Sequence, residues 1–219
     1  MGPPPVRVKI CGITRDEDAR AAAAAGADAV GFVFAATSPR RVTAETARRL
    51  AALLPPFVTA VGVFAGEPAS RVREIAREAA LRVVQVHGDD VAREIAAEPR
   101  GLAVIAAARL ASADDARGLD ARFPGAAAIL CDSAARTETG REGGTGVAFP
   151  WEWLRGVALG SPLVLAGGLT PENVAEAVRV ARPYAVDVST GVESSPGVKD
   201  ARRVAAFVAA AKGEALGST

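Results

Sequence analysis

The chain has 219 residues, half of them apolar, and a formal net charge of +1 at pH 7. The near-zero charge argues against a nucleic-acid-binding protein, which would carry a strong excess of basic residues. Two cysteines are too few for a disulfide framework at this length. No apolar run approaches the roughly 20 residues of a membrane helix, and the opening MGPPPVRVKI has no apolar signal core. We therefore expect a cytoplasmic protein with reduced thiols and with neither a nucleic-acid nor a membrane partner.

A repeating pattern runs along the chain: a short apolar run, a polar or glycine-rich turn, and then an amphipathic stretch. This alternation is typical of buried parallel strands joined by helical crossovers. Eight strands are predicted, at Val6–Ile10, Asp28–Phe34, Phe57–Phe64, Arg82–Val86, Leu102–Ala107, Ala126–Cys131, Pro162–Ala166 and Tyr184–Val188. Helices are predicted at Asp16–Ala25, Thr43–Leu53, Pro68–Ala79, Pro171–Val180 and Val198–Ala211, with the weakest pattern in the fifth helix, near Ser112–Arg122.

Eight such units predict a single (β/α)8 barrel, the TIM barrel, for which about 200 residues is near the lower limit. A doubly wound open sheet is the alternative. No linker or shift in composition divides the chain, so residues 1–219 are interpreted as one domain. In a (β/α)8 barrel the active site lies at the carboxyl ends of the strands. The residues that follow each predicted strand are therefore the candidates for function.

Cys11 follows the first predicted strand, within KICGIT. Side chains alternate along a strand, so Lys9 and Cys11 share one face and Ile10 takes the other. If Ile10 faces the helices, Lys9 and Cys11 point into the barrel. A nearby ammonium would lower the pKa of the thiol towards neutral pH, and a thiolate can act as a nucleophile or as a general base. The alternative is that Cys11 is a small buried packing residue.

Asp132 ends the sixth predicted strand, directly after Cys131. The two side chains must face opposite ways, and a carboxylate is far costlier than a thiol to bury against helices. We therefore expect Asp132 to face the site and Cys131 to lie in the core. Asp132 could still serve only as a helix cap or a loop anchor.

Three further polar residues follow or end strands. Arg40 lies in SPRR after the second strand and could bind a carboxylate through two parallel hydrogen bonds, although Arg41 is an equally basic candidate. His87 is the single histidine and the chain has no cluster of thiols, which argues against a zinc site. Asp187 should face inward on the eighth strand, where it could pair with Lys9 in a contact that is purely structural. His87 and Asp187 join Arg40 as candidates for substrate binding.

Glycine-rich turns follow the last two strands. The loops after strands seven and eight, with the N-terminus of a short extra helix, form a recurring phosphate site in these barrels. Here those turns are Gly167-Gly168 and Ser189–Gly191, with the extra helix expected at Val192–Ser194. A third glycine-rich turn, GGTG at Gly143–Gly146, lies in a long polar loop that we interpret as a lid over the site.

Taken in order, these segments resemble the phosphoribosylanthranilate isomerase family of tryptophan biosynthesis. The resemblance runs from about Val6 to about Phe207, and several of its motifs are distinctive among phosphosugar barrels. Two positions depart from the family pattern, because Val86 replaces a Leu and Thr190 replaces a Ser, and both changes keep the chemistry. The motifs are VRVKICGIT, DAVGFVF followed by SPR, VGVF, VQVHG, LCDS, GGTG, LAGGLTPENV and YAVDVSTGVESSPGVKD.

The resemblance implies an Amadori rearrangement of N-(5-phosphoribosyl)anthranilate, a small phosphosugar substrate, without a metal or cofactor. Asp132 would be the general acid that opens the ribose ring, and Cys11 the general base that removes the C2′ proton. Arg40 would hold the anthranilate carboxylate. Members of the family are monomers or homodimers, so either state is open. The phosphate would be held by Gly144, Thr145, Gly146, Gly167, Gly168, Ser189, Thr190 and Gly191.

Three other functions compete with this interpretation. A related isomerase acting on an aminoimidazole ribonucleotide would use two carboxylates, which Cys11 disfavours. A metal-dependent phosphosugar epimerase would need more than one histidine. A non-catalytic phosphosugar-binding barrel would keep the phosphate turns but would have no use for a thiol and a carboxylate on opposite strands.

Overall fold

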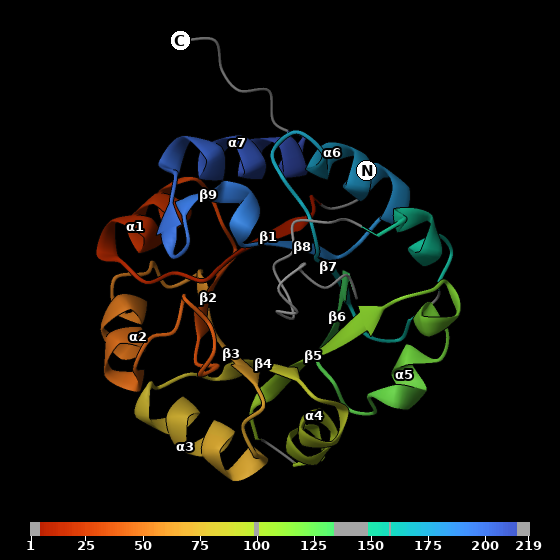
Figure 1. Cartoon of the computed structure of the whole chain (residues 1–219), viewed down its shortest axis with the longest axis horizontal. Helices are drawn as coiled ribbons and strands as arrows, with labels where there is room; N and C mark the ends of the chain where they lie inside the picture. The colour runs from red at the N-terminus through yellow and green to blue at the C-terminus, as the bar shows by residue number, and fades with distance from the viewer. Residues whose placement is uncertain (1–4, 99–100, 134–148, 158, 214–219) are drawn as a thin grey trace.

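The structure is a computed structural model that describes residues 5–98, 101–133, 149–157 and 159–213. Eight parallel strands pair in chain order and close into a barrel, with the helices arranged around the outside (Figure 1). The predicted (β/α)8 barrel is thereby confirmed, and the open doubly wound sheet is excluded. The strands are β1 Arg7–Cys11, β2 Ala29–Val33, β3 Thr59–Ala65, β4 Val83–His87, β5 Ala103–Leu110, β6 Ala128–Ser133, β7 Leu163–Leu165 and β8 Ala185–Val188.

The helices match the sequence pattern best in the first half of the chain. There the caps are simple: the Thr43 hydroxyl accepts a hydrogen bond from the amide of Thr46 at the start of α2. The α-helices are α1 Asp16–Ala24, α2 Ala44–Ala51, α3 Ala69–Glu78, α4 Asp89–Ala96, α5 Leu119–Arg122, α6 Val174–Ala181 and α7 Ala201–Lys212. The short 3₁₀ helices are η1 Asp114–Ala116, η2 Trp151–Leu154 and η3 Thr190–Val192.

Two helical predictions need correction in this second half. The fifth helix is reduced to η1 and the single turn of α5. The sixth begins at Val174 and not at Pro171, because the side chain of Asn173 accepts a hydrogen bond from the Thr170 amide and holds a turn before it. Between β6 and β7, the described residues form only η2.

The segment after β8 also differs from the prediction. No helix covers Val192–Ser194: η3 ends at Val192 and a strand, β9 (Glu193–Ser195), follows. This strand pairs antiparallel with β10 (Val198–Lys199) across a turn at Gly197, whose φ is +81°. The last helix therefore begins at Ala201 and not at Val198. The carboxylate of Asp200 caps this helix by accepting hydrogen bonds from the amides of Arg202 and Arg203.

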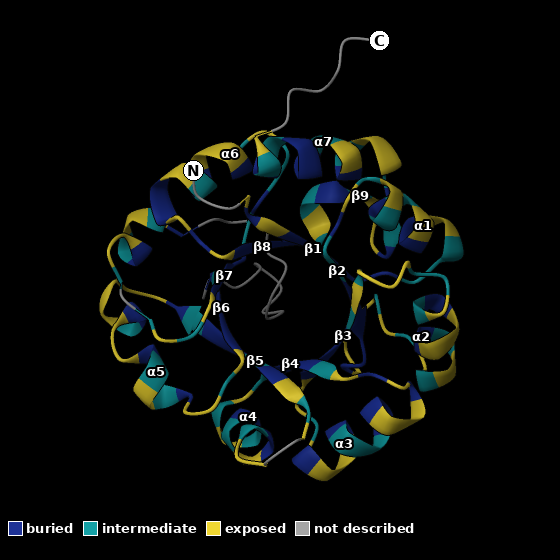
Figure 2. Cartoon of the chain, turned by 180° about the vertical axis from the view of Figure 1, so that it is seen from behind, coloured by how far each residue is buried: buried dark blue, intermediate teal, exposed yellow. Residues whose placement is uncertain are grey.

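Strand alternation separates an outer apolar face from an inner face. Ile10 on β1 and Cys131 on β6 join the large core between strands and helices. Their strand neighbours turn inward, so that Leu130 packs in a smaller cluster inside the barrel. Figure 2 shows the buried strands and the exposed residues on the outward sides of the helices. Inside the barrel, the buried polar residues Lys9 and Asp187 lie side by side in the register of β1 and β8.

Candidate active site

Cys11 and Lys9 face the inside of the barrel, as predicted from alternation. Cys11 packs with Val33 and Val63 in a small inner cluster. Ile10, which lies between Lys9 and Cys11 on the strand, belongs to the outer core. Across from β1, a Cβ added at Gly31 would lie 2.8 Å from the Cys11 Sγ and 3.3 Å from the Lys9 Cε. A side chain at this position would displace both groups. The glycine therefore makes room for the thiol and the ammonium at the same level of the barrel.

Lys9 is held at the centre of a buried polar network. Its Nζ donates to Asp187 Oδ1 at 2.8 Å and to Gln85 Oε1 at 2.9 Å. Gln85 Nε2 lies 3.0 Å from His87 Nε2, which extends the network to the end of β4. The predicted pairing of Asp187 with Lys9 is confirmed. It links three strands through side chains that each have a defined partner.

The electrostatic environment of Cys11 differs from the prediction in one respect. Burial raises the pKa of the Cys11 thiol above its ordinary value, although the ammoniums of Lys9 and Lys199 favour the thiolate. The expected direction of the Lys9 effect is therefore correct, but burial and the carboxylate of Asp187 outweigh it. Burial lowers the pKa of Lys9, yet attraction to Asp187 and Cys11 prevails and leaves that pKa raised. Lys9 is therefore a cation at neutral pH.

Asp132 lies at the end of β6, half-buried, while Cys131 before it is fully buried in the outer core. Both orientations match the prediction. Asp132 Oδ1 accepts a hydrogen bond of 2.7 Å from the Ser133 amide. A Cβ at Gly167 would lie 2.6 Å from that same oxygen, so the turn after β7 leaves space for the carboxylate. Burial raises the pKa of Asp132 to about 6, with a further contribution from Asp187 and opposition from the Ser133 amide. An acid with that pKa holds a proton close to neutral pH.

His87 is a neutral imidazole in this environment. Burial, followed by the charges of Arg109 and Lys9, lowers the pKa of His87 to about 4. At neutral pH the ring therefore both donates and accepts a hydrogen bond. Gln85 holds one ring nitrogen, and the position of His87 at the carboxyl end of β4 places it at the same end of the barrel as Cys11 and Asp132.

Arg40 lies at the rim with its guanidinium engaged by protein groups. Nε donates to Glu193 Oε1 at 2.8 Å, and Nη2 donates to Glu193 Oε2 at 2.6 Å and to Thr190 Oγ1 at 3.1 Å. Arg41 beside it is exposed, and its backbone forms an isolated parallel β-bridge with Val33. The choice between the two arginines, which the sequence left open, therefore favours Arg40.

The turns after β7 and β8 lie in contact with each other. A Cβ at Gly191 would lie 2.0 Å from the carbonyl oxygen of Leu169, so the two backbones meet where only glycine fits. Gly167 and Gly168 both have positive φ, at +88° and +64°. The structure thus brings together Gly167, Gly168, Ser189, Thr190 and Gly191. The third predicted turn, with Gly144, Thr145 and Gly146, lies outside the described residues, as does the proposed lid.

Sequence reasoning missed three residues of this constellation: Gln85, Glu193 and Lys199. Gln85 had a signal, since it is the polar residue between Val84 and Val86 in VQVH and alternation places it on the face of His87. Glu193 and Lys199 had none, because their segment was interpreted as helix. Both side chains are buried, at 3% and 0% exposure.

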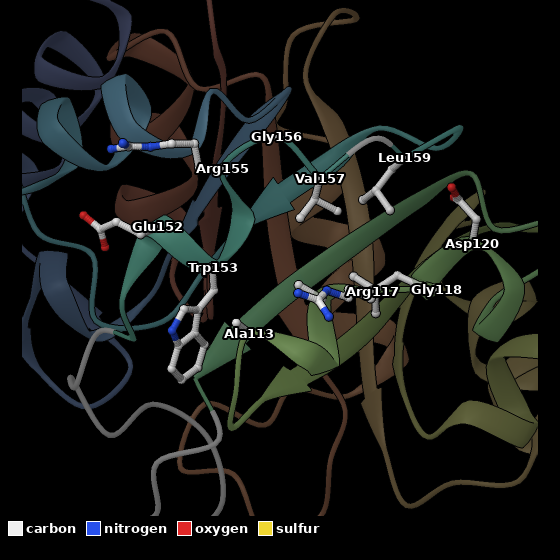
Figure 3. Close-up of a pocket in the computed structure, with 12 residues that line it drawn as sticks. Ala113, Arg117, Gly118, Asp120, Glu152, Trp153, Arg155, Gly156, Val157 and Leu159 are labelled. Atoms are coloured by element: carbon white, nitrogen blue, oxygen red, sulfur yellow. The ribbon is translucent and has the colours of Figure 1, made fainter.

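No competing site is found among the described residues. A cavity of about 530 Å³ lies outside the barrel, between η1, α5 and η2, where Arg117 and Trp153 line it (Figure 3). It contains none of the residues discussed above. Within the described ranges, no group of three or more His, Cys, Asp or Glu side chains is arranged to hold a metal ion. No described helix has the length and apolar character needed to span a membrane.

Comparisons with known proteins point to one family. A family model described as N-(5′-phosphoribosyl)anthranilate isomerase matches residues 8–210. The N-(5′-phosphoribosyl)anthranilate isomerase of Pseudomonas aeruginosa (strain UCBPP-PA14) is 52% identical over 209 residues, covering 95% of this chain and 96% of the relative.

Solved structures agree. A structure of monomers generated from the dimeric phosphoribosylanthranilate isomerase of Thermotoga maritima has a TM-score of 0.80 and 38% identity, covering 95% of this chain and 99% of that one. A phosphoribosylanthranilate isomerase in complex with reduced 1-(o-carboxyphenylamino)-1-deoxyribulose 5-phosphate has a TM-score of 0.79 and 41% identity, with the same coverage of both chains.

Proposed function

The chain belongs to the N-(5′-phosphoribosyl)anthranilate isomerase family, and from this premise we propose which of its residues carry the reaction. The protein is an isomerase of tryptophan biosynthesis. It converts N-(5-phosphoribosyl)anthranilate into 1-(2-carboxyphenylamino)-1-deoxyribulose 5-phosphate. Neither an aminoimidazole isomerase nor a binding barrel is favoured by these relationships.

Asp132 is the general acid of the first step. Its carboxyl group donates a proton to the ribose ring oxygen, the bond from C1′ to that oxygen breaks, and the nitrogen lone pair forms the protonated Schiff base. The raised pKa of Asp132, about 6, supports this role because a more acidic carboxyl would rarely hold the proton. The space that Gly167 leaves beside its oxygen supports it as well.

Cys11 is the general base of the second step. Its thiolate accepts the C2′ proton, and the electrons of that C–H bond form the C1′–C2′ double bond while the Schiff base becomes a neutral enolamine. Tautomerisation with protonation at C1′ gives the ketone. The observation that carries the proposal is the inward position of Cys11 next to the cationic Lys9, at the same rim as Asp132. Lys9 stabilises the thiolate against the cost of burial.

The remaining residues bind the substrate in this proposal. Arg40 holds the anthranilate carboxylate, while His87 and Asp187 line the sugar. The contacting turns at Gly167-Gly168 and Ser189–Gly191 bind the phosphate, together with the turn Gly144–Gly146. Backbone N–H groups at such turns are suited to phosphate oxygens. The relative solved with a reduced product analogue supports the assignment of a carboxylated phosphosugar ligand.

Several wider features belong to the same proposal. The chain is taken as one domain that works in the cytoplasm, without metal or cofactor, and its partner is the small-molecule substrate. It is a monomer or a homodimer. The relative from Thermotoga maritima, which is dimeric and from which monomers have been generated, supports both states as open to this fold.

The test follows the anthranilate ribonucleotide through loss of its fluorescence, with a chelator and no added metal. Wild-type protein should convert it, and Cys11→Ala and Asp132→Asn should each lower kcat/KM by about 10²- to 10⁴-fold, the scale of a general acid or base. Full activity in either variant contradicts the role of that residue. Loss of wild-type activity in the chelator, restored by a metal, contradicts the metal-free reaction.

A further inference from the structure

We propose that Glu193, neutralised by the buried Lys199, is a positioning residue that fixes the guanidinium of Arg40 for the substrate carboxylate. This inference rests on the proposed role of Arg40 and adds a reason for its selectivity. Glu193 and Lys199 belong to the hairpin β9–β10, which the barrel fold does not require. The hairpin would then be a specificity element, coupled to both ends of the substrate.

The contact between Arg40 and Glu193 is a two-point clamp. Nε and Nη2 each donate to a different oxygen of the Glu193 carboxylate, at 2.8 Å and 2.6 Å. The residues are 153 positions apart in sequence, and their side chains are only 15% and 3% exposed. Such paired hydrogen bonds fix the plane of a guanidinium as well as its position. Arg40 therefore has a set orientation before any substrate binds.

The clamp also decides which nitrogen of Arg40 meets the substrate. Thr190 Oγ1 takes the second hydrogen of Nη2, at 3.1 Å. Within the described residues these contacts engage Nε and Nη2, and Nη1 is the nitrogen that they do not engage. The carboxylate of the substrate would consequently bind at Nη1, and the guanidinium would bridge it to Glu193.

Lys199 explains how a carboxylate can lie buried at this point. Its Nζ donates to Glu193 Oε1 at 2.8 Å and to the Ser189 carbonyl at 3.1 Å, and its side chain is fully buried. Its backbone amide donates to Asp18 Oδ2 at 3.2 Å, which ties β10 to α1. Burying a charge is costly unless it is paired, and here Glu193 is paired on two sides. Arg40 and Lys199 hold the pKa of Glu193 below its usual range despite burial.

This arrangement joins three parts of the site. Arg40 passes close to the start of the turn after Cys11, since a Cβ at Gly12 would lie 2.5 Å from the Arg40 Cδ. Lys199 binds Ser189 in the phosphate turn, and its charge also favours the Cys11 thiolate. The ion chain Arg40–Glu193–Lys199 thus runs from the carboxylate end of the substrate to the phosphate end, past the base.

A purely structural role for the pair makes a different prediction. If Glu193 only fastened the hairpin to the barrel, its loss would weaken every ligand of the site alike. If it positions Arg40, its loss weakens only ligands that carry the carboxylate. The test is therefore a comparison of two inert ligands: the reduced product analogue, and its counterpart with a phenyl ring in place of the carboxyphenyl ring.

Calorimetric binding of both ligands to the full chain gives the selectivity of each variant. Arg40→Ala should weaken the carboxylated ligand by about 10- to 100-fold, the scale of a charge-assisted hydrogen bond, and the phenyl ligand by less than about 3-fold. Glu193→Gln should show the same selective loss at about 10-fold, because the amide cannot accept from both Arg40 and Lys199. Glu193→Met/Lys199→Met removes both buried charges together and keeps the volume similar in a stably folded protein. It also removes the bond of Lys199 to Ser189, so it should weaken both ligands, the carboxylated one by about 10-fold more than the phenyl one.

Asp89→Asn is the matched control. Asp89 clamps Arg122 through the same two nitrogens, Nε at 2.6 Å and Nη2 at 3.0 Å, on the outer helices α4 and α5. The Asp89→Asn variant should keep the wild-type selectivity between the carboxylated ligand and the phenyl ligand.

The outcomes separate the two claims. If Arg40→Ala does not lose the carboxylated ligand selectively, the assignment of Arg40 itself is wrong, and the inference fails with it. If Arg40→Ala shows the selective loss but the two Glu193 variants weaken both ligands equally, or neither, Arg40 keeps its role and the positioning by Glu193 is overturned. An equal selective loss in Asp89→Asn would overturn it too, since any broken clamp would then give the same result.

Discussion

The two cysteines of this barrel both lie near the carboxyl end of a strand, and their surroundings have opposite characters. Cys11 is the last residue of β1, Cys131 lies two residues before the last residue of β6, Ser133, and both are buried. Cys11 faces inward beside the ammonium of Lys9, and its charged form is favoured by two cations. Cys131 faces the helices, where burial raises the pKa of its thiol to about 12, although the charge of Arg122 favours the thiolate.

In the proposed mechanism, strand face and not burial separates the thiol that acts as a base from the thiol that only packs, since both are buried. A shift of one residue along a strand would exchange the two environments. The inner face is costly to build, because it holds the buried charges of Lys9 and Asp187 and a carboxyl group of raised pKa at Asp132. On the outer face, Cys131 belongs to the large apolar core. Function on one face is therefore opposed to stability, and the following predictions test that contrast.

The largest expected effect is on catalysis at the inner cysteine. Cys11→Ala should lower kcat/KM by about 10²- to 10⁴-fold because the C2′ proton loses its acceptor. Cys131→Ala should leave kcat/KM within about 2-fold, since its side chain points away from the substrate. Steady-state fluorescence assays on both variants measure the ratio, and similar losses in the two would remove the distinction between faces.

The next effect is on stability at the buried ion pair. Lys9→Met should reduce the free energy of unfolding by about 3–5 kcal/mol, because the Asp187 carboxylate is left buried without its partner. Lys9→Met/Asp187→Leu should recover most of that loss by removing both charges. Urea unfolding of both variants measures the difference. A double variant no more stable than the single one would show that the pair stabilises the fold by itself.

Asp132 should show the opposition of function and stability in one residue. Its pKa is about 6 in the folded protein against an ordinary value of 3.8. Between these values the folded state binds more protons than the unfolded state, so stability falls as pH rises from about 4 to about 6 and stays lower above that. Asp132→Asn should therefore raise the free energy of unfolding by about 1–3 kcal/mol at pH 8 and do nothing at pH 3. A destabilised variant at pH 8 would contradict the raised pKa.

The pH dependence of activity should also separate the acid from the base. The productive enzyme holds one proton on Asp132 and none on Cys11, so kcat/KM should fall below pH about 6, where both groups are protonated, and again above the raised pKa of Cys11. In Asp132→Asn the acid limb at about 6 should disappear and the residual activity should rise with pH until Cys11 is ionised. A limb at 6 that persists in this variant belongs to the substrate phosphate and not to Asp132.

The smallest effect is on stability at the outer cysteine. Cys131→Ala removes one buried sulfur from a well-packed core and should reduce the free energy of unfolding by about 1 kcal/mol. Thermal or urea unfolding detects a change of this size. A loss of activity with unchanged stability would mean that Cys131 contributes to the site.

The sequence predicted the barrel because its signals are local and repeated. Apolar runs and turns recur at the correct spacing, and alternation within a run is enough to place Lys9 and Cys11 inward and Ile10 outward. The same alternation correctly assigned Asp132 and Cys131 to opposite faces. The weak pattern near Ser112–Arg122 was matched by a correspondingly weak helix, reduced to two short turns.

What the sequence did not predict depends on contacts between distant residues. The sequence pattern predicted helix where Glu193 and Lys199 form a hairpin. That hairpin is stabilised by contacts that a local pattern does not contain: Glu193 binds Arg40, 153 positions away, and Lys199 binds Asp18. The raised pKa of Cys11 was missed for a similar reason. The effect of Lys9 follows from spacing along one strand, but the burial that outweighs it comes from the closed barrel as a whole.

Ionisation of Cys11 compared directly with activity tests the central claim best. The ultraviolet absorbance of the thiolate, measured against pH in Cys131→Ala and corrected by the Cys11→Ser/Cys131→Ala protein, isolates the inner thiol from Tyr184. We predict one ionisation, raised above the ordinary pKa of a thiol, that coincides with the alkaline limb of kcat/KM in Cys131→Ala. An alkaline limb that occurs at a different pH from this ionisation, or that is retained at full activity in Cys11→Ser/Cys131→Ala, would contradict Cys11 as the base.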